Sequence, residues 1–160
     1  MPKSKMEEEI CIDISIIEKK ADENHRIYQE LKRKILSIPE GEFDSIVHPL
    51  AEKISEKINC TQCGNCCKQL NPPVREDEIE RLSEKKKCSK HEFSSQFLHR
   101  NENQSYYFFK KKPCIFLDET RCSVYENRPD SCADYPHLIS SGQKFRFGRT
   151  IEQAGICPIA

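Results

Sequence analysis

The sequence predicts a mainly helical α+β fold in which two N-terminal helices precede a small, irregular, cysteine-rich core with a short β-hairpin. Apolar residues recur at three- and four-residue intervals through much of residues 10–58, which is the period of amphipathic helices. Nine of the ten cysteines follow residue 59, and four of them fall within residues 60–67. Two β-prone runs flank the polar residues 118–121, a pattern typical of a hairpin.

The N-terminal part is expected to form two amphipathic helices. The first stripe ends before Pro39-Glu40-Gly41, where proline and glycine stop a helix. The second runs from Phe43 to Ile58, and Pro49 fits better near the start of that helix than in its middle, because proline lacks a backbone N–H. We expect both stripes to be packing faces; the alternative is that residues 5–38 form a helix that binds a protein partner. The first stripe consists of Ile10, Ile14, Ile17, Ala21, Tyr28, Leu31, Ile35 and Ile38.

Shorter elements are expected beyond the first cysteines. An acidic start predicts a short helix over residues 75–82, and the polar residues 83–104 predict a surface helix followed by a loop. Three segments are β-prone: residues 106–109, a hairpin over residues 115–125 with a four-residue loop, and a last short strand over residues 145–147.

The change in composition along the chain suggests two parts. We expect an N-terminal helical extension over residues 1–44 and a cysteine-rich domain over residues 45–160. Apolar residues make up 36% of the chain, a share that includes the ten cysteines, so the apolar core is expected to be thin. Domains with thin cores commonly rely on disulfides or metal ions for stability.

Charge and compartment narrow the function classes. Lys+Arg and Asp+Glu both number 26, so the formal net charge is zero and gives no general attraction to nucleic acid. Residues 1–9 contain no apolar secretory segment, and no stretch approaches the ~18 apolar residues of a membrane span. We therefore expect a cytoplasmic chain, whose clustered thiols stay reduced and bind metal more often than they form disulfides. The alternative, a disulfide framework, would require an export route.

The run Cys60-x2-Cys63-x2-Cys66-Cys67 predicts a metal site. Two cysteines three positions apart can present both thiolates to one ion, because the loop between them is short. Gly64 and Asn65 are turn residues, which suits a tight metal-binding loop. Adjacent side chains diverge in regular backbone, so Cys66 and Cys67 are expected to serve two centres or to bridge two ions.

Later cysteines complete a set of eight, enough for two four-cysteine sites. Zinc suits such all-cysteine sites. Iron is the alternative, because Cys60-x2-Cys63-x2-Cys66 has the spacing that holds three corners of a [4Fe–4S] cluster, with Cys157-Pro158 as a remote fourth ligand. Cys11, Cys88 and His137 are not expected to be ligands. The predicted metal ligands are Cys60, Cys63, Cys66, Cys67, Cys114, Cys122, Cys132 and Cys157.

These residues resemble a known family. The run Cys60–Cys67 is similar to the signature of the CxxCxxCC family, the YkgJ-type cysteine-cluster or zinc/iron-chelating domain. Residues 113–132, with Cys114-Ile115-Phe116-Leu117 and Cys122-Ser123-Val124-Tyr125-Glu126-Asn127-Arg128-Pro129-Asp130-Ser131-Cys132, resemble its second block, and Cys157-Pro158 resembles its end. The resemblance covers about residues 45–160 and implies the same eight cysteines. Ala133 stands where the family often has an arginine.

Arg128, within the second block, has two expected roles. Its guanidinium would stabilise a site crowded with negative thiolates, or it would form an ion pair with Glu126 or an aspartate.

The function expected from these patterns is chelation of zinc or iron, including an iron–sulfur cluster, in a structural, redox or metal-handling role. The alternative is an accessory or catalytic component of a protein-modifying enzyme, because the family resembles part of flagellin lysine-N-methylase. No Gly-rich cofactor loop is present and no catalytic residue is expected. Nucleic-acid binding through Lys85–Lys87 and Lys110–Lys112 is disfavoured by the zero net charge. Metal binding and folding are expected to be one event, so that removal of the metal by a chelator unfolds residues 60–157.

Overall fold

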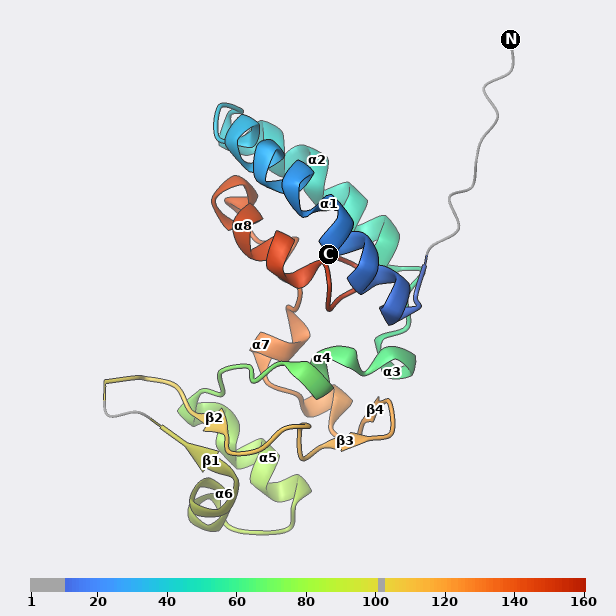
Figure 1. The fold of residues 1–160 in the computed structure, drawn as a ribbon. Coiled ribbons are helices and arrows are strands. Elements are labelled where there is room, and N and C mark those ends of the chain that lie inside the picture. The colour runs from blue at the N-terminus through green and yellow to red at the C-terminus, as the bar shows by residue number, and fades with distance from the viewer. Residues whose placement is uncertain (1–10, 101–102) are drawn as a thin grey trace. The chain divides into compact units, whose positions relative to one another are not determined.

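A computed structural model describes residues 11–100 and 103–160 of the chain (Figure 1). It has the predicted fold class, α+β and mainly helical, with two small antiparallel strand pairs. The chain divides into two compact units: the first runs up to Ile58 and resumes with Leu138–Ala160, and the second is Asn59–His137. The boundary expected between residues 44 and 45 stays a prediction. In the described part of the chain, no helix has the length and apolar character needed to cross a membrane.

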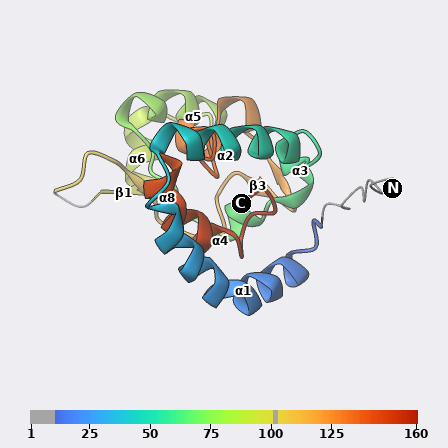
Figure 2. The ribbon, with the colours of Figure 1, turned by 90° about the horizontal axis from the view of Figure 1, so that it is seen from above.

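The first unit consists of three helices, α1 (Ile14–Ile35), α2 (Glu40–Ser55) and α8 (Gln143–Gln153). Asp13 begins α1 by accepting hydrogen bonds from the backbone N–H groups of Ser15 and Ile16 at 2.9 and 3.4 Å. Helix α8 packs against both α1 and α2 (Figure 2). The buried apolar side chains of this unit are Ile35, Phe43, Ala51, Ile58, Leu138, Ile151, Cys157 and Ile159.

Two predictions for the first unit are wrong. Pro49 lies inside α2, because the helix already begins at Glu40, directly after Pro39. Ser45 and Pro49 are both exposed, so the carbonyl that loses its helical donor can bond to water. The strand expected at residues 145–147 is instead part of α8.

Contacts with α2 explain why the last segment is helical. Asp44 accepts hydrogen bonds from the backbone N–H groups of Gly142 and Gln143, both at 2.8 Å, and so satisfies donors at the start of α8. The rings of Phe43 and Phe147 meet edge to face at 6.0 Å, whereas Phe145 is 67% exposed. Of the two phenylalanines, only Phe147 contacts α2, as expected for residues two positions apart on a helix.

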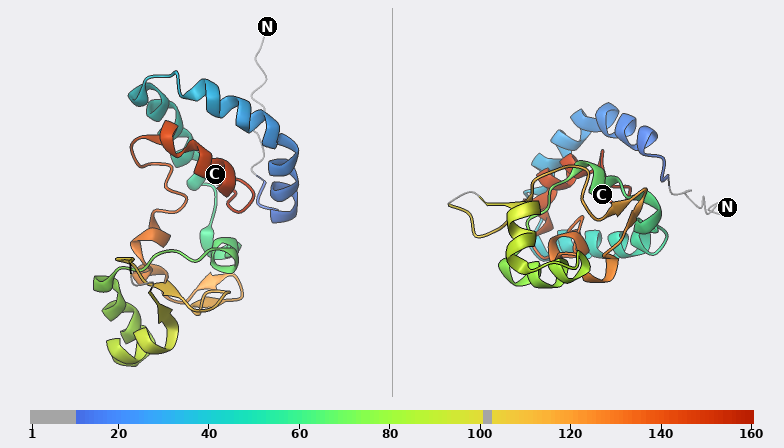
Figure 3. Two further views of the ribbon diagram at one scale, coloured as in Figure 1. Left: turned by 60° about the vertical axis from the view of Figure 1, so that its left-hand side comes forward. Right: turned by 90° about the horizontal axis from the view of Figure 1, so that it is seen from below.

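In the second unit, an apolar core lies among short elements. Helices α5 (Ile79–Lys85) and α6 (Lys90–Phe97) lie side by side, next to the strand pair of β1 (Leu98–His99) and β2 (Phe108–Phe109) (Figure 3). The core consists of Val74, Ile79, Leu82, Phe93, Leu98, Phe109, Phe116 and Val124. The helix expected within residues 75–82 is confirmed, preceded by a 3₁₀ turn η1 (Glu76–Glu78).

The predicted hairpin is present, with a shorter loop than expected. Strands β3 (Leu117–Asp118) and β4 (Arg121–Cys122) pair antiparallel, and only Glu119 and Thr120 connect them. Glu119 has a positive φ of 53°, as such tight connections require. A 3₁₀ turn η2 (Tyr125–Asn127) and helix α7 (Asp130–Ala133) follow.

Candidate metal centre

The first four predicted ligands lie on two short helices, α3 (Cys60–Cys63) and α4 (Asn65–Gln69). The side chain of Asn59 begins α3 by accepting a hydrogen bond from the N–H of Thr61 at 3.0 Å. Gly64 joins the two helices in the left-handed conformation, with φ 61°. A Cβ at this position would lie 2.5 Å from the carbonyl oxygen of Thr120, so only glycine allows the β3–β4 turn to approach.

The next two predicted ligands, Cys114 and Cys122, are brought to this run by backbone and turn contacts. The N–H of Cys114 donates to the carbonyl of Cys67 at 2.9 Å. Cys122 lies on β4, which packs against α3, and the Thr120 hydroxyl donates to the Thr61 carbonyl at 3.4 Å. The hairpin thus places Cys122 beside the first cysteine run although about 60 residues separate them.

Cys132, on α7, completes a group of seven. Cys114, Cys66 and Cys122, when ionised, each raise the pKa of its thiol. Cys60 is affected in the same way by Cys66 and Cys63, and Cys67 by Cys66, Cys114 and Cys122. The second unit therefore gathers seven of the eight predicted ligands: Cys60, Cys63, Cys66, Cys67, Cys114, Cys122 and Cys132.

The eighth predicted ligand, Cys157, is buried in the first unit just after α8, where its N–H donates to Gln153 O at 2.8 Å. Its role as a ligand stays a prediction. Cys11 lies in the first unit, before α1, and Cys88 packs against the apolar core of the second. His137 has its ring edge-on to that of Tyr135, at 6.1 Å. That Cys11, Cys88 and His137 are not ligands also stays a prediction.

Burial and mutual repulsion disfavour the ionised form of most of these thiols. Burial, followed by the charges of neighbouring thiolates, raises the pKa of Cys132 to about 12. Partial removal from water is also the main reason why the pKa values of Cys60, Cys114 and Cys122 are raised, although Cys60 as a whole is exposed. A bound cation would reverse this effect, because metal ligation favours the thiolate.

Cys66 and Cys67 interact directly with one another. A hydrogen bond between their side chains lowers the pKa of Cys66 to about 7 and raises that of Cys67. The two thiols of α4 are therefore in contact, and their service of two centres or as a bridge between two ions stays a prediction. Cys66 also acts electrostatically on Cys60, Cys114, Cys122 and Cys132.

Two cations oppose the rise in thiol pKa. Arg128 lowers the pKa values of Cys60 and Cys122, although burial outweighs it at both. Its guanidinium lies 3.8 Å from the centre of the Tyr125 ring and donates to the Tyr125 carbonyl. Lys86 acts similarly on Cys114. Of the two roles expected for Arg128, its effect on the pKa values of Cys60 and Cys122 therefore supports stabilisation of the thiolates.

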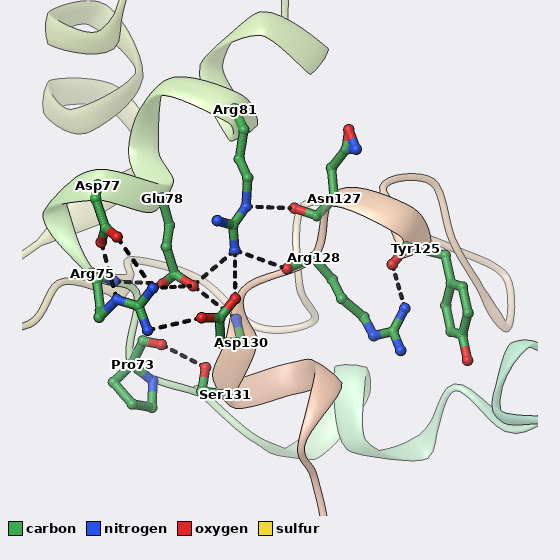
Figure 4. A network of polar contacts seen from close by, with 10 residues as sticks. All are labelled: Pro73, Arg75, Asp77, Glu78, Arg81, Tyr125, Asn127, Arg128, Asp130 and Ser131. Carbon is green, nitrogen blue, oxygen red and sulfur yellow. Dashed lines mark hydrogen bonds and ion pairs between the residues drawn. The ribbon is translucent and has the colours of Figure 1, made fainter.

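A polar network beside the cysteines is a feature that sequence patterns did not predict (Figure 4). Glu78 is 1% exposed, and ion pairs link its carboxylate to Arg75 and Arg81. Both arginines also pair with Asp130, at 2.8 and 3.0 Å. Along the sequence these charges resemble an ordinary solvated helix start, because their partner Asp130 lies about 50 residues away.

The donor set fits the metals that the sequence suggests. Zinc and iron–sulfur clusters both bind cysteine thiolates, and seven thiols gather in the second unit. Within residues 11–100 and 103–160, no three His, Cys, Asp or Glu side chains are already arranged to hold an ion.

Comparison with known proteins agrees with this donor set. Residues 59–157 match the model of the CxxCxxCC family, described as "Putative zinc- or iron-chelating domain". No curated protein and no solved structure matched the chain. The match begins beside Cys60, ends at Cys157 and spans more than half of the 160 residues. The resemblance predicted from the cysteine motifs is thus confirmed, and the chain belongs to the CxxCxxCC family.

Proposed function

We propose that this protein chelates zinc or iron through the thiolates of its patterned cysteines and has no catalytic activity of its own. The observation that carries the proposal is the gathering of seven cysteines, from four separate elements and a loop, close enough to affect one another's ionisation. Unrelated core thiols have no reason to converge in this way. The proposed ligands are Cys60, Cys63, Cys66, Cys67, Cys114, Cys122, Cys132 and Cys157.

Contacts among the cysteines favour a particular division of ligands. Cys67 is bonded through its carbonyl to the N–H of Cys114 and responds to the charges of Cys114 and Cys122. These three, with Cys132, suit one four-thiolate centre. Cys60, Cys63 and Cys66 would supply a second, and the spacing of the sequence alone suggests Cys157 as its fourth ligand. Cys66 acts on members of both groups, which favours a bridging position.

The residues around the thiols would supply charge compensation. Each thiol that ligates a metal must lose its proton, so binding is coupled to proton release. Arg128 and Lys86 would stabilise the resulting thiolates. Zinc bound there would support the fold, whereas an iron–sulfur cluster would add one-electron redox chemistry.

Neither alternative function is favoured by the contacts. Three of the six lysines in the two basic runs are engaged within the protein, since Lys86, Lys110 and Lys112 donate to the backbone carbonyls of Ile115, Ser95 and Gln69. Nothing in the described residues supports the methylase-related alternative. A cytoplasmic location, and a protein partner for the N-terminal helix, stay predictions from the sequence.

Metal analysis of anaerobically purified protein would test the proposal. We expect bound zinc in a colourless sample, or iron with charge-transfer absorption in a brown one. Cys122→Ser should lower the metal content, whereas Cys88→Ser, the matched control in the same unit, should leave it unchanged. Equal loss in both variants, or wild-type protein without metal, would refute the proposed function.

A further inference from the structure

We infer that Glu78 is a positioning residue for the metal centre, because its buried carboxylate holds the loop that carries Arg128 and Cys132. This inference rests on the proposed function. Glu78 itself is not proposed as a ligand: both of its carboxylate oxygens already accept hydrogen bonds from the protein, as Figure 4 shows.

The carboxylate of Glu78 joins two parts of the second unit. One oxygen, Oε2, accepts the N–H of Arg75 at 2.7 Å, within the same turn of chain. The other, Oε1, accepts Nη2 of Arg81 at 2.8 Å and the N–H of Asp130, the first residue of α7, also at 2.8 Å. The Glu78 side chain, on η1, therefore bonds directly to the first residue of α7, the helix that carries Cys132.

Arg81 extends this attachment along the loop. Its Nε donates to the carbonyl of Asn127 at 3.3 Å, and its Nη2 donates to the carbonyl of Arg128 at 3.1 Å. The hydroxyl of Ser131 adds a bond of 2.6 Å to the carbonyl of Pro73. Bonds to backbone or side chain thus hold the loop at four of the five positions from residue 127 to residue 131.

The loop needs this external support because it has little of its own. Helix α7 has four residues, none of them buried, and so short a helix is not stable alone. Metal–thiolate distances tolerate deviations of only about 0.2 Å. A loop free to shift would therefore weaken ligation by Cys132 and move Arg128 away from Cys60 and Cys122.

The buried position of the Glu78 carboxylate determines how it contributes to the structure. An ion pair that excludes water stabilises a fold weakly, since desolvation offsets much of the attraction. What the pair does provide is fixed geometry at both ends. Replacement of Glu78 leaves no buried charge unpaired, because Arg75 and Arg81 are partly exposed and both also pair with Asp130. We therefore expect it to affect metal affinity more than folding.

The test compares Glu78→Gln with Glu80→Gln in the full chain. The first change keeps the side-chain shape but replaces one acceptor oxygen by an NH2 group, so the side chain can no longer accept the N–H groups of both Arg75 and Asp130, and it loses the charge that pairs with Arg81. The second removes the same charge from an exposed position on the neighbouring turn. Co²⁺ serves as the probe, because its thiolate charge-transfer band reports how many sulfurs bind each ion.

We expect Glu78→Gln to bind Co²⁺ about 10- to 100-fold more weakly than wild type, with a weaker thiolate band per ion. Amide exchange should accelerate at residues 127–134 but stay slow in α5 and α6. Glu80→Gln should match wild type throughout. Unchanged Co²⁺ affinity and band intensity in Glu78→Gln would overturn the inference while leaving the proposed function intact.

Two further outcomes are also decisive. If amide exchange in α5 and α6 becomes fast in Glu78→Gln, that variant is unfolded and Arg81→Lys serves as the test variant instead. Lysine keeps the ion pair with Glu78 but cannot hold the carbonyls of Asn127 and Arg128 together. The same affinity and band criteria then apply to Arg81→Lys. A wild-type chain that takes up neither Co²⁺ nor iron overturns both the inference and the proposed function.

Discussion

The two compact units of this chain are built from elements of very different length. The three helices of the first unit have 22, 16 and 11 residues, whereas the longest described helix of the second has eight. Long amphipathic helices carry their own hydrogen bonds and need only a packing face. The short elements of the second unit are instead held by side-chain bonds to distant backbone, as at Thr120, Arg81 and Ser131.

A second contrast lies inside the second unit. Its apolar core involves α5, α6 and the β1–β2 pair, together with Phe116 and Val124. The cysteine-bearing helices α3 and α7 have no buried residue, and the one buried residue of α4 is Asn65. Hydrophobic burial therefore stabilises one part of the unit, whereas helices α3, α4 and α7 contribute no buried apolar side chain. Because of this contrast, we expect metal removal to unfold the cysteine-bearing helices α3, α4 and α7, and not the whole of residues 60–157.

Metal removal is the change with the largest expected effect. Structural zinc contributes on the order of 10–16 kcal/mol in small thiolate modules at pH 7. Removal of the metal by a chelator should make amide exchange fast in α3, α4 and α7, while it stays slow in α5, α6 and the helices of the first unit. Hydrogen exchange with and without chelator measures this difference. Uniform loss of protection throughout the second unit would show that its apolar core is not self-sufficient.

Truncation of the apolar core tests the other half of the contrast. Phe93 is fully buried and stacks on Phe116 at 6.1 Å, so Phe93→Ala should cost about 3–5 kcal/mol of unfolding free energy. Phe145→Ala in the first unit, where the ring is 67% exposed, should change it by less than about 0.5 kcal/mol. Denaturant unfolding of the metal-loaded proteins measures both, and similar values would contradict the core assignment.

Substitution of glycine should have opposite effects in the two units. Gly64→Ala places a Cβ against Thr120 at a positive φ, and we expect a loss of at least about 1–2 kcal/mol together with weaker metal binding. Gly41→Ala, in α2, meets no atom within 4 Å and should stabilise the first unit by up to about 1 kcal/mol. Thermal unfolding and metal titration distinguish the two; a harmless Gly64→Ala would refute the close approach of the hairpin.

The smallest effect is expected from acidification of the first unit. Hydrogen bonds from the N–H of Gly142, and also from Gln143, lower the pKa of Asp44 below its ordinary value near 3.8. Its stabilising contribution is thus present above about pH 4 and is lost as the pH falls through the lowered pKa. Asp44→Ala should cost about 1 kcal/mol at pH 7 and much less below pH 3. Exchange rates of α8 amides from pH 3 to 7 would show it, and a pH-independent cost would contradict the assignment.

The elements that the sequence predicted well are those with local patterns. The stripe from Ile14 to Ile35 predicted α1, and the aromatic run before Lys110 predicted β2. Predictions failed where a distant partner decided the outcome. Residues 145–147 alternate like a strand, but Asp44 and Phe43 make them part of a helix. Pro49 was placed wrongly because α2 begins directly after Pro39.

For the candidate site, the sequence by itself determined the chemistry, since the spacing of Cys60, Cys63, Cys66 and Cys67 and the family motifs identify a thiolate donor set. Tertiary structure alone decided which thiols meet, how Gly64 admits the hairpin, and how Glu78 and Arg81 hold the loop before Cys132. The physical reason is how far apart along the chain the interacting residues lie. Ligand spacing within a turn depends on local backbone geometry, whereas a hydrogen bond between residues 50 positions apart depends on the path of the whole chain between them.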